Sequence, residues 1–200
     1  MSLKPPPRNF SRIPLTTKSV SVKDLYRISR YSSGEPYFGK TANNRFDDRS
    51  RPKKGRFGTC YFGLDLETAI AETVLHDEMP VKGTFFIAYT EIASRYLVRF
   101  KRGSLMLAKL TGVSLKTLGG HGSLSTIIPY DLPQRWAMAV HRHPQCVDGI
   151  YYMSRHLNDR PAVVVFERAK ARLAGASAEG LPRVSEIMKA LAALRISFVS

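Results

Sequence analysis

The chain has 200 residues with a hydrophobic fraction of 44%, which is enough to fill the core of one domain and excludes wholesale disorder. The sequence has no apolar run long enough to span a membrane and no apolar stretch of the kind found in secretory signals. Its two cysteines, Cys60 and Cys146, lack metal-ligand spacing. We therefore expect a cytoplasmic protein with no disulfide framework. The 31 Lys and Arg residues exceed the 16 Asp and Glu residues and give a net charge of +15, which predicts a polyanionic partner: nucleic acid, a phosphorylated ligand or an acidic protein.

The N-terminal region is expected to be irregular. Residues 1–20 are rich in proline, including Pro5–Pro7, and we predict a tail there followed by a single domain over 21–200. The first strand is predicted over 24–29 because apolar side chains alternate there. A polar loop rich in glycine and proline then runs over 31–58, and loops of that length are often functional.

The middle of the chain is predicted to contain several strands and one helix. A short strand over 59–63 leads to a helix for which Asp65 is the predicted N-cap. Leu66, Ile70 and Val74 recur at helical spacing and define its buried face. Further strands are predicted over 84–89, 96–100 and 105–113, and a mobile Gly/Ser-rich loop over 118–125.

The C-terminal part continues this mixed order. The predicted elements are a helix over 133–143, strands over 150–153 and 161–167, a helix over 184–194 and a last strand over 196–199. Because the order lacks regular βαβ alternation, the sequence predicts the α+β class.

Several chemical patterns can be weighed from residue types alone. His141 and His143 are two positions apart and face different ways on a helix, so spacing predicts no metal site. The glycine-rich segment 119–123 matches no nucleophile or phosphate-loop motif and is interpreted as a flexible loop. The basic stretch 45–56 fits a solvated loop, a nucleic-acid patch or a loop in which one arginine holds a phosphate, and charge alone does not separate these.

Glu72 and Ser154 remain ambiguous on pattern alone. Glu72 projects from the helical face opposite the apolar stripe, where it faces either water or a cleft. Ser154 and Arg155 follow directly after a predicted strand, and their plainest interpretation is a turn serine and a surface arginine.

An ordered set of motifs resembles the RES-domain family, the toxin half of bacterial toxin–antitoxin pairs. The matching segments, spread over about 25–166, are Leu25-Tyr26-Arg27, Asn44-Arg45-Phe46-Asp47, Gly55 to Phe62, Glu67 to Thr73, Arg135-Trp136-Ala137 with His141, and Asp148 to His156. The resemblance places the family's arginine, glutamate and serine at Arg27 (with Arg45 as a second arginine), Glu72 and Ser154.

The resemblance implies a fold similar to ADP-ribosyltransferases of the diphtheria-toxin type, with a cleft between two small sheets and flanking helices. It implies NAD⁺ as the substrate and cleavage of the nicotinamide–ribose bond by hydrolysis or phosphorolysis, with transfer of ADP-ribose to a protein as the alternative; no metal is expected, on the histidine spacing given above. The implied partner is a helix-turn-helix antitoxin of the Xre type, through which any contact with nucleic acid would be made. The resemblance does not decide whether the protein forms a homo-oligomer or whether Arg49, Lys53 or Lys54 contacts a phosphate.

The implied chemistry is consistent with a single carboxylate. Glycoside cleavage usually takes two, but the nicotinamide of NAD⁺ departs as a neutral molecule without protonation, so Glu72 alone could stabilise the oxocarbenium-like ribose. Arg27 and Arg45 would bind the pyrophosphate, Tyr61 would stack beside the ribose, and Ser154 would orient either the ligand or Glu72. The competing classes are a basic nucleic-acid-binding module, for which the sequence shows no recognition motif, and a structural partner of an acidic protein.

Overall fold

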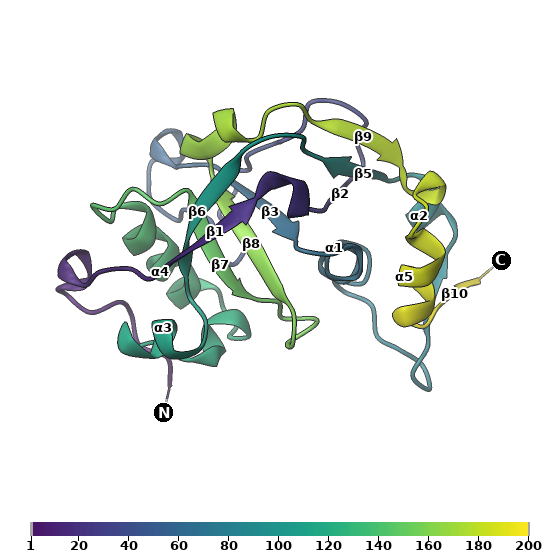
Figure 1. Ribbon diagram of the computed structural model, residues 1–200. Helices are drawn as coiled ribbons and strands as arrows, with labels where there is room; N and C mark the ends of the chain where they lie inside the picture. Colours follow the sequence, from purple (N-terminus) through teal and green to yellow (C-terminus); the bar gives the residue numbers. More distant parts are fainter. Residues whose placement is uncertain (1, 200) are drawn as a thin grey trace.

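The computed structural model describes residues 2–199 and contains a central five-stranded sheet. Its strands, in spatial order, are β1 (Thr17–Ser21), β6 (Ser104–Lys109), β7 (Gly149–Met153), β8 (Pro161–Phe166) and β3 (Thr59–Gly63). All neighbours are antiparallel except β6 and β7, which are parallel. This sheet is the framework of one half of the molecule (Figure 1).

Two smaller sheets complete the strand arrangement. One is antiparallel and contains β2 (Arg27–Ser29), β5 (Tyr96–Arg99) and β9 (Ser177–Gly180). The other pairs β4 (Phe85–Ala88) in parallel with β10 (Ile196–Val199). The expected α+β class with flanking helices is confirmed, and the structure adds this third, two-stranded sheet to the two that were expected.

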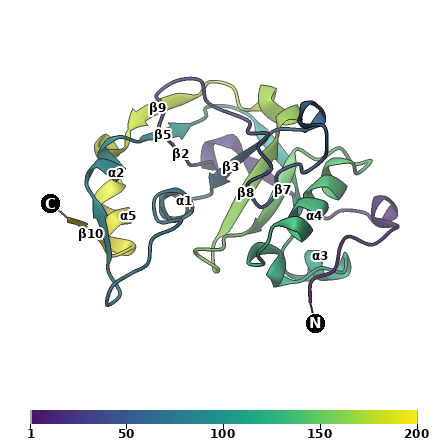
Figure 2. The ribbon, with the colours of Figure 1, turned by 180° about the vertical axis from the view of Figure 1, so that it is seen from behind.

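Within residues 2–199, five α-helices surround the sheets: α1 (Leu66–Thr73), α2 (Thr90–Ala93), α3 (Gly112–Thr117), α4 (Asp131–His141) and α5 (Ile187–Ala193). In Figure 1, α1 lies between the five-stranded sheet and the pair formed by α5 and β10. From behind, α4 lies across the face of β7 and β8 (Figure 2). No helix within residues 2–199 is long and apolar enough to cross a membrane.

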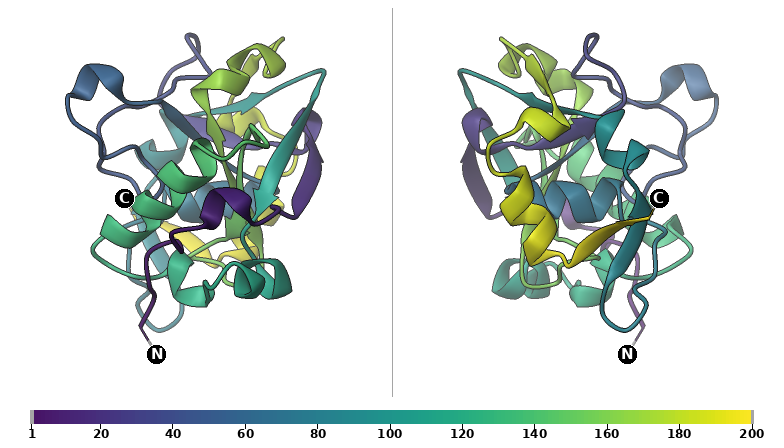
Figure 3. Two further views of the ribbon diagram at one scale, coloured as in Figure 1. Left: turned by 90° about the vertical axis from the view of Figure 1, so that its left-hand side faces the viewer. Right: turned by 90° about the vertical axis from the view of Figure 1, so that its right-hand side faces the viewer.

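Strand β8 explains how the core is divided. Val164 and Phe166 point to the cluster that contains Trp136 of α4, whereas Val163 and Val165 point to the opposite face. Both faces of the five-stranded sheet are therefore covered, which is why this strand is apolar at nearly every position. A third cluster joins α1, α5 and β4, and Figure 3 shows α5 beside the C-terminal strand.

The N-terminal segment differs most from expectation. The predicted tail over 1–20 includes most of β1, which pairs with β6 along its whole length. Leu3, Phe10 and Leu15 are buried in the core cluster around Trp136, whose indole Nε1 donates to the carbonyl of Lys4 at 3.0 Å. Single apolar residues among prolines give no periodic signal, so this packing was not visible in the sequence.

Element boundaries differ from expectation in several places. The strand predicted over 105–113 ends at Lys109, and Gly112 begins α3; the helix predicted over 184–194 begins only at Ile187. Strand β9 was not predicted, and its composition, Ser-Ala-Glu-Gly, has little strand preference. The loop predicted over 118–125 contains a 3₁₀ turn whose Leu124 is buried. The predicted N-cap is confirmed, since the Asp65 side chain accepts a hydrogen bond from the Thr68 amide at 2.6 Å.

Candidate functional site

A cavity of about 590 Å³ opens where β2, β3, α1 and the long polar loop meet. Its size is within the range of ligand pockets. Four of the five site residues expected from the sequence line it: Arg27, Arg45, Tyr61 and Glu72. The fifth, Ser154, lies behind Glu72 and is 1% exposed.

Glu72 is held by the segment that follows β7. Its Oε1 accepts a hydrogen bond from the Ser154 hydroxyl at 2.5 Å and another from the Arg155 amide at 3.2 Å. On the opposite side of α1, Leu66 and Ile70 are buried in the core, so the helix is fixed with Glu72 facing the cavity. Of the two environments that the sequence allowed for Glu72, water or a cleft, the structure has the cleft.

Ser154 organises the turn as well as the carboxylate. Its Oγ accepts hydrogen bonds from the amides of His156 at 3.1 Å and Leu157 at 3.0 Å. Because both amides donate to Oγ, the hydroxyl proton is available for Glu72. Ser154 does not line the cavity, so its geometry suits orienting Glu72 rather than touching a ligand.

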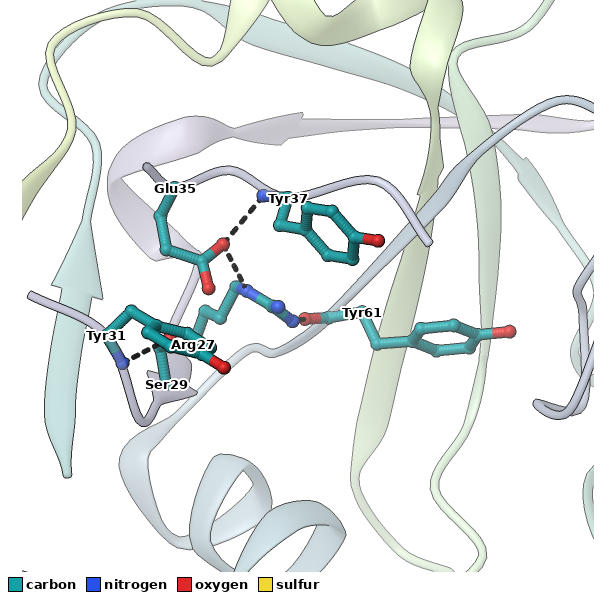
Figure 4. Close-up of polar contacts among 6 residues, drawn as sticks. All are labelled: Arg27, Ser29, Tyr31, Glu35, Tyr37 and Tyr61. Carbon is teal, nitrogen blue, oxygen red and sulfur yellow. Dashed lines mark hydrogen bonds and ion pairs between the residues drawn. The ribbon is translucent and has the colours of Figure 1, made fainter. Parts of the chain in front are cut away.

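Arg27 is anchored by an acidic partner (Figure 4). Its Nε donates to Glu35 Oε2 at 2.8 Å, and its Nη1 lies 3.4 Å from the carbonyl oxygen of Tyr61. The same Glu35 oxygen accepts from the Tyr37 amide at 2.7 Å. Although burial opposes ionisation, the hydrogen bond from Arg27 lowers the pKa of Glu35 below its ordinary value. The pair fixes the guanidinium at the cavity wall and offsets part of its charge.

Arg45 reaches the same cavity from the long loop with an unused donor. Its Nη1 donates to the carbonyl of Ile127 at 2.9 Å, and its guanidinium carbon lies 4.5 Å from the centre of the Tyr130 ring. Its Nη2 is buried and has no hydrogen-bond partner among the described residues. Burial lowers the pKa of Arg45 from its ordinary value, but an arginine side chain remains charged near neutral pH. Since an unpaired buried donor is costly, the site fits an anion that accepts from Nη2.

Asp47 holds both the loop and Tyr61 in place. Its carboxylate accepts from the Thr59 hydroxyl at 2.6 Å, the Tyr61 hydroxyl at 3.0 Å and the Asn44 amide at 3.1 Å. The Tyr61 hydroxyl in turn accepts from the Phe46 amide at 2.9 Å. Burial, reinforced by the Asp47 carboxylate, raises the pKa of Tyr61 well above its ordinary value, so the phenol stays protonated. With its hydroxyl engaged, Tyr61 offers the cavity mainly its ring.

The rest of the basic stretch does not line this cavity. Arg49 forms an ion pair with Asp131 at the start of α4, and Lys53 and Lys54 are exposed on a 3₁₀ turn. Arg56 donates to the backbone carbonyls of Ser50, Lys40 and Thr41. The structure therefore gives no support to the phosphate contacts that the resemblance left open for Arg49, Lys53 and Lys54.

Among the cavity residues that the sequence analysis did not assign to the site, three carry groups that could bind a ligand. His76 and His156 lie beside Glu72, with one potential ligand atom from each of the three side chains within 4.8 Å of the others. Arg155, interpreted as a surface residue, also lines the cavity. The one available signal was that His76 follows Glu72 by four residues in the stretch predicted to be helical, although α1 ends at Thr73 and His76 lies beyond it. The approach of His156 depends on the tertiary fold.

The comparisons with known proteins agree with this architecture. The model of the RES domain family matches residues 24–185. A chain in the crystal structure of the M. tuberculosis MbcT–MbcA toxin–antitoxin complex is similar in fold, with a TM-score of 0.54, 12% sequence identity, and coverage of 88% of this chain and 92% of that chain. No curated protein matches the sequence. The family match spans most of the chain and contains all five expected site residues, and we conclude that this protein belongs to the RES domain family.

Proposed function

We propose that this protein is the toxin of a toxin–antitoxin pair and depletes NAD⁺ by cleaving its nicotinamide–ribose bond, with water or phosphate as the acceptor. The observation that carries the proposal is the position of the Glu72 carboxylate. It is held by Ser154 in the same cavity as Arg27 and Arg45, so one anionic group and two cationic groups converge on one ligand-sized space.

Glu72 supplies the negative charge that this chemistry needs. As the bond to nicotinamide breaks, positive charge develops on the ribose, and a fixed carboxylate stabilises it electrostatically. The hydrogen bonds from Ser154 and the Arg155 amide fix Oε1 before the substrate arrives. Because the leaving group is neutral, no second carboxylate has to donate a proton.

The arginines would bind the pyrophosphate of NAD⁺. Nη2 of Arg45 has no partner among the described residues and would donate to a phosphate oxygen once a small side-chain shift exposes it, and Arg27 keeps donor capacity beyond its bond to Glu35. Tyr61 presents its ring to the same space and would flank the ribose beside the nicotinamide. Ser154 then acts as a positioning residue for Glu72.

The acceptor and the partner follow from charge. Arg155 adds a third guanidinium to the cavity wall, which favours an anionic acceptor such as phosphate. Transfer of ADP-ribose to a protein is the alternative use of the same site. The net charge of +15 suits an acidic partner, and the fold relative comes from a toxin–antitoxin complex; both support an antitoxin as the partner. The helix-turn-helix type, and an antitoxin that covers the cavity, are proposed from the resemblance to the RES-domain family.

The decisive experiment is to incubate the purified protein with NAD⁺, with and without phosphate, and to identify the products by mass. Hydrolysis yields nicotinamide and ADP-ribose, whereas phosphorolysis yields nicotinamide and ADP-ribose 1″-phosphate. Glu72→Gln should lower the rate by at least about 100-fold, the loss typical of removing one transition-state electrostatic contact. Glu78→Gln, which removes an exposed carboxylate outside the cavity, is the matched control.

Two results would contradict the proposal. One is an unchanged rate of NAD⁺ loss in Glu72→Gln. The other is tight, steeply salt-dependent binding of RNA or DNA by a protein that leaves NAD⁺ intact, which would favour a nucleic-acid-binding module.

A further inference from the structure

The cluster of Glu72, His76 and His156 has the composition of a transition-metal site. One carboxylate and two imidazoles are common ligands of Zn²⁺, and sites with three protein ligands keep a fourth position for water or another molecule. Potential ligand atoms of the three side chains all lie within 4.8 Å of one another, and the two imidazole rings are 5.0 Å apart between centroids. All three residues line the proposed substrate cavity, which gives an ion a route from solvent.

A second observation supports a ligand at this place. The Nε2 atom of His156 is buried and has no hydrogen-bond partner among residues 2–199, although buried polar atoms are nearly always paired. Both hydrogen bonds found for the Glu72 carboxylate go to Oε1, so Oε2 is the oxygen left for a cation. A cation held by the His156 imidazole and the Glu72 carboxylate would engage a carboxylate oxygen that has no hydrogen bond among the described residues.

The three ligand atoms have to move slightly closer together to bind one ion, because they now lie within 4.8 Å of one another. Ligands about 2.1 Å from a tetrahedral Zn²⁺ lie roughly 3.4 Å from one another. The His76 side chain is 43% exposed and lies beyond the end of α1, so it can rotate toward the other two ligands. Arg45 and Arg155 face the same cavity and oppose a cation, while Glu72 and Asp77 favour it. This balance predicts reversible binding rather than a permanent structural metal.

We propose that Glu72, His76 and His156 bind Zn²⁺ and that this binding excludes cleavage of NAD⁺. The first half stands on the cluster itself; the second rests on the proposed role of Glu72. A cation coordinated by Glu72 neutralises the charge that would stabilise the ribose and adds positive charge where positive charge develops. Zn²⁺ would then be an inhibitor, and chelation would activate the enzyme.

The binding test uses untagged, chelator-treated protein titrated with ZnCl₂ in a calorimeter. Wild-type protein should bind one Zn²⁺ per chain. His76→Ala should weaken binding by more than about tenfold, since loss of even an outer-sphere partner of a metal ligand costs that much. Because His76 is partly exposed, this substitution should leave the thermal unfolding temperature close to that of the wild type, and the scan checks that the variant is folded.

Two matched controls test the position of the site. His121→Ala removes a histidine outside the cavity, and Cys146→Ser removes the exposed thiol; both should bind Zn²⁺ as the wild type does. No binding by the wild type, or equal binding by His76→Ala and His121→Ala, would overturn the site.

The inhibition test measures NAD⁺ loss for each variant with and without Zn²⁺. Zn²⁺ should suppress the reaction of the wild type, and the suppression should shift to higher Zn²⁺ concentration in His76→Ala. One Zn²⁺ bound at His76 with undiminished NAD⁺ loss would overturn the inhibitory role while leaving the metal site intact. If the protein binds Zn²⁺ but never consumes NAD⁺, the proposed function fails and the metal site remains.

Discussion

Arg45 and Arg49 lie four residues apart in the same loop, yet the fold uses them in opposite ways. Arg45 is buried at the cavity with one donor nitrogen unpaired, whereas Arg49 is paired with Asp131 at the start of α4. The next charges along the stretch are either exposed, as at Lys53, or spent on backbone carbonyls, as at Arg56. The positive charge that is clustered in the sequence is therefore divided by the fold: of Arg45, Arg49, Lys53 and Arg56, Arg45 alone lines the cavity.

The two aspartates between these arginines explain the division. Asp47 collects hydrogen bonds from Thr59 and Tyr61 and fixes the part of the loop that carries Arg45. Asp48 accepts hydrogen bonds from the amides of Ser50 and Phe57 and so links the two ends of the basic part of the loop. Buried carboxylates with several donors rigidify a loop, and here they separate the part of the loop that lines the cavity from the basic part that does not.

The sharpest test of this comparison is to remove each arginine in turn. Arg45→Ala should lower kcat/KM for NAD⁺ by about 30-fold or more, because a charge-assisted contact to a phosphate is lost from a desolvated site. Arg49→Ala should change kcat/KM by less than about twofold, since it loses only a half-exposed ion pair. Steady-state kinetics of both variants measure the difference, and equal losses would erase the distinction between the two parts of the loop.

Ser154→Ala tests the positioning role of the residue that lies behind Glu72. It removes the donor to Glu72 and the acceptor for two backbone amides, so we expect kcat to fall by about tenfold with little change in KM. Ser154→Thr, which keeps the hydroxyl, should recover part of kcat. A rise in KM with unchanged kcat would instead indicate that Ser154 contacts the substrate.

Arg56→Ala tests whether the basic part of the loop, residues 49–56, stabilises the fold. Its three hydrogen bonds to carbonyls are partly exposed, so we expect the free energy of unfolding to fall by about 1–2 kcal/mol. Denaturant unfolding measures this change. Lys53→Ala, at an exposed position, is the control and should stay within about 0.5 kcal/mol of the wild type. An equal loss in both variants would contradict the structural role of Arg56.

The smallest expected effect is a pH dependence of the free energy of unfolding, caused by His141, which stacks on Phe57 just after the basic stretch 45–56. Phe57 stacks on His141 with ring centroids 3.9 Å apart. Burial, followed by the nearby Arg168 guanidinium, lowers the pKa of His141 to about 4. In the unfolded chain the pKa is about 6.5, so between these values the unfolded state binds a proton that the folded state does not, and the free energy of unfolding falls as pH drops through this window.

After allowance for solvent screening, this loss should be about 1 kcal/mol between pH 7 and pH 5. Denaturant unfolding of the wild type and of His141→Phe at both pH values measures it, because the variant keeps an aromatic stack but has no proton to gain. If both proteins lose the same stability, His141 does not contribute to the pH dependence.

The RES-family resemblance and much of the secondary structure are predictable from the amino-acid sequence, whereas the site is predictable only in part. Asp65 as N-cap and the apolar stripe of Leu66, Ile70 and Val74 were both predicted, because they are encoded within one or two helical turns. The motif resemblance named Arg27, Arg45, Tyr61 and Glu72, which all line one cavity. It did not reveal Glu35 behind Arg27, the burial of the N-terminal segment, or strand β9.

Most helices and strands, the surplus of positive charge and the position of Glu72 opposite the apolar stripe of its helix can be predicted from the order of the amino acids. Three features depend on the folded chain: Glu72 faces a cavity, Ser154, 82 residues away, donates to it, and His76 and His156 lie beside it. The physical reason is that propensity and periodicity act between neighbouring residues, whereas a site is made by contacts across the chain. Those contacts form only when burial of the apolar faces brings distant segments together.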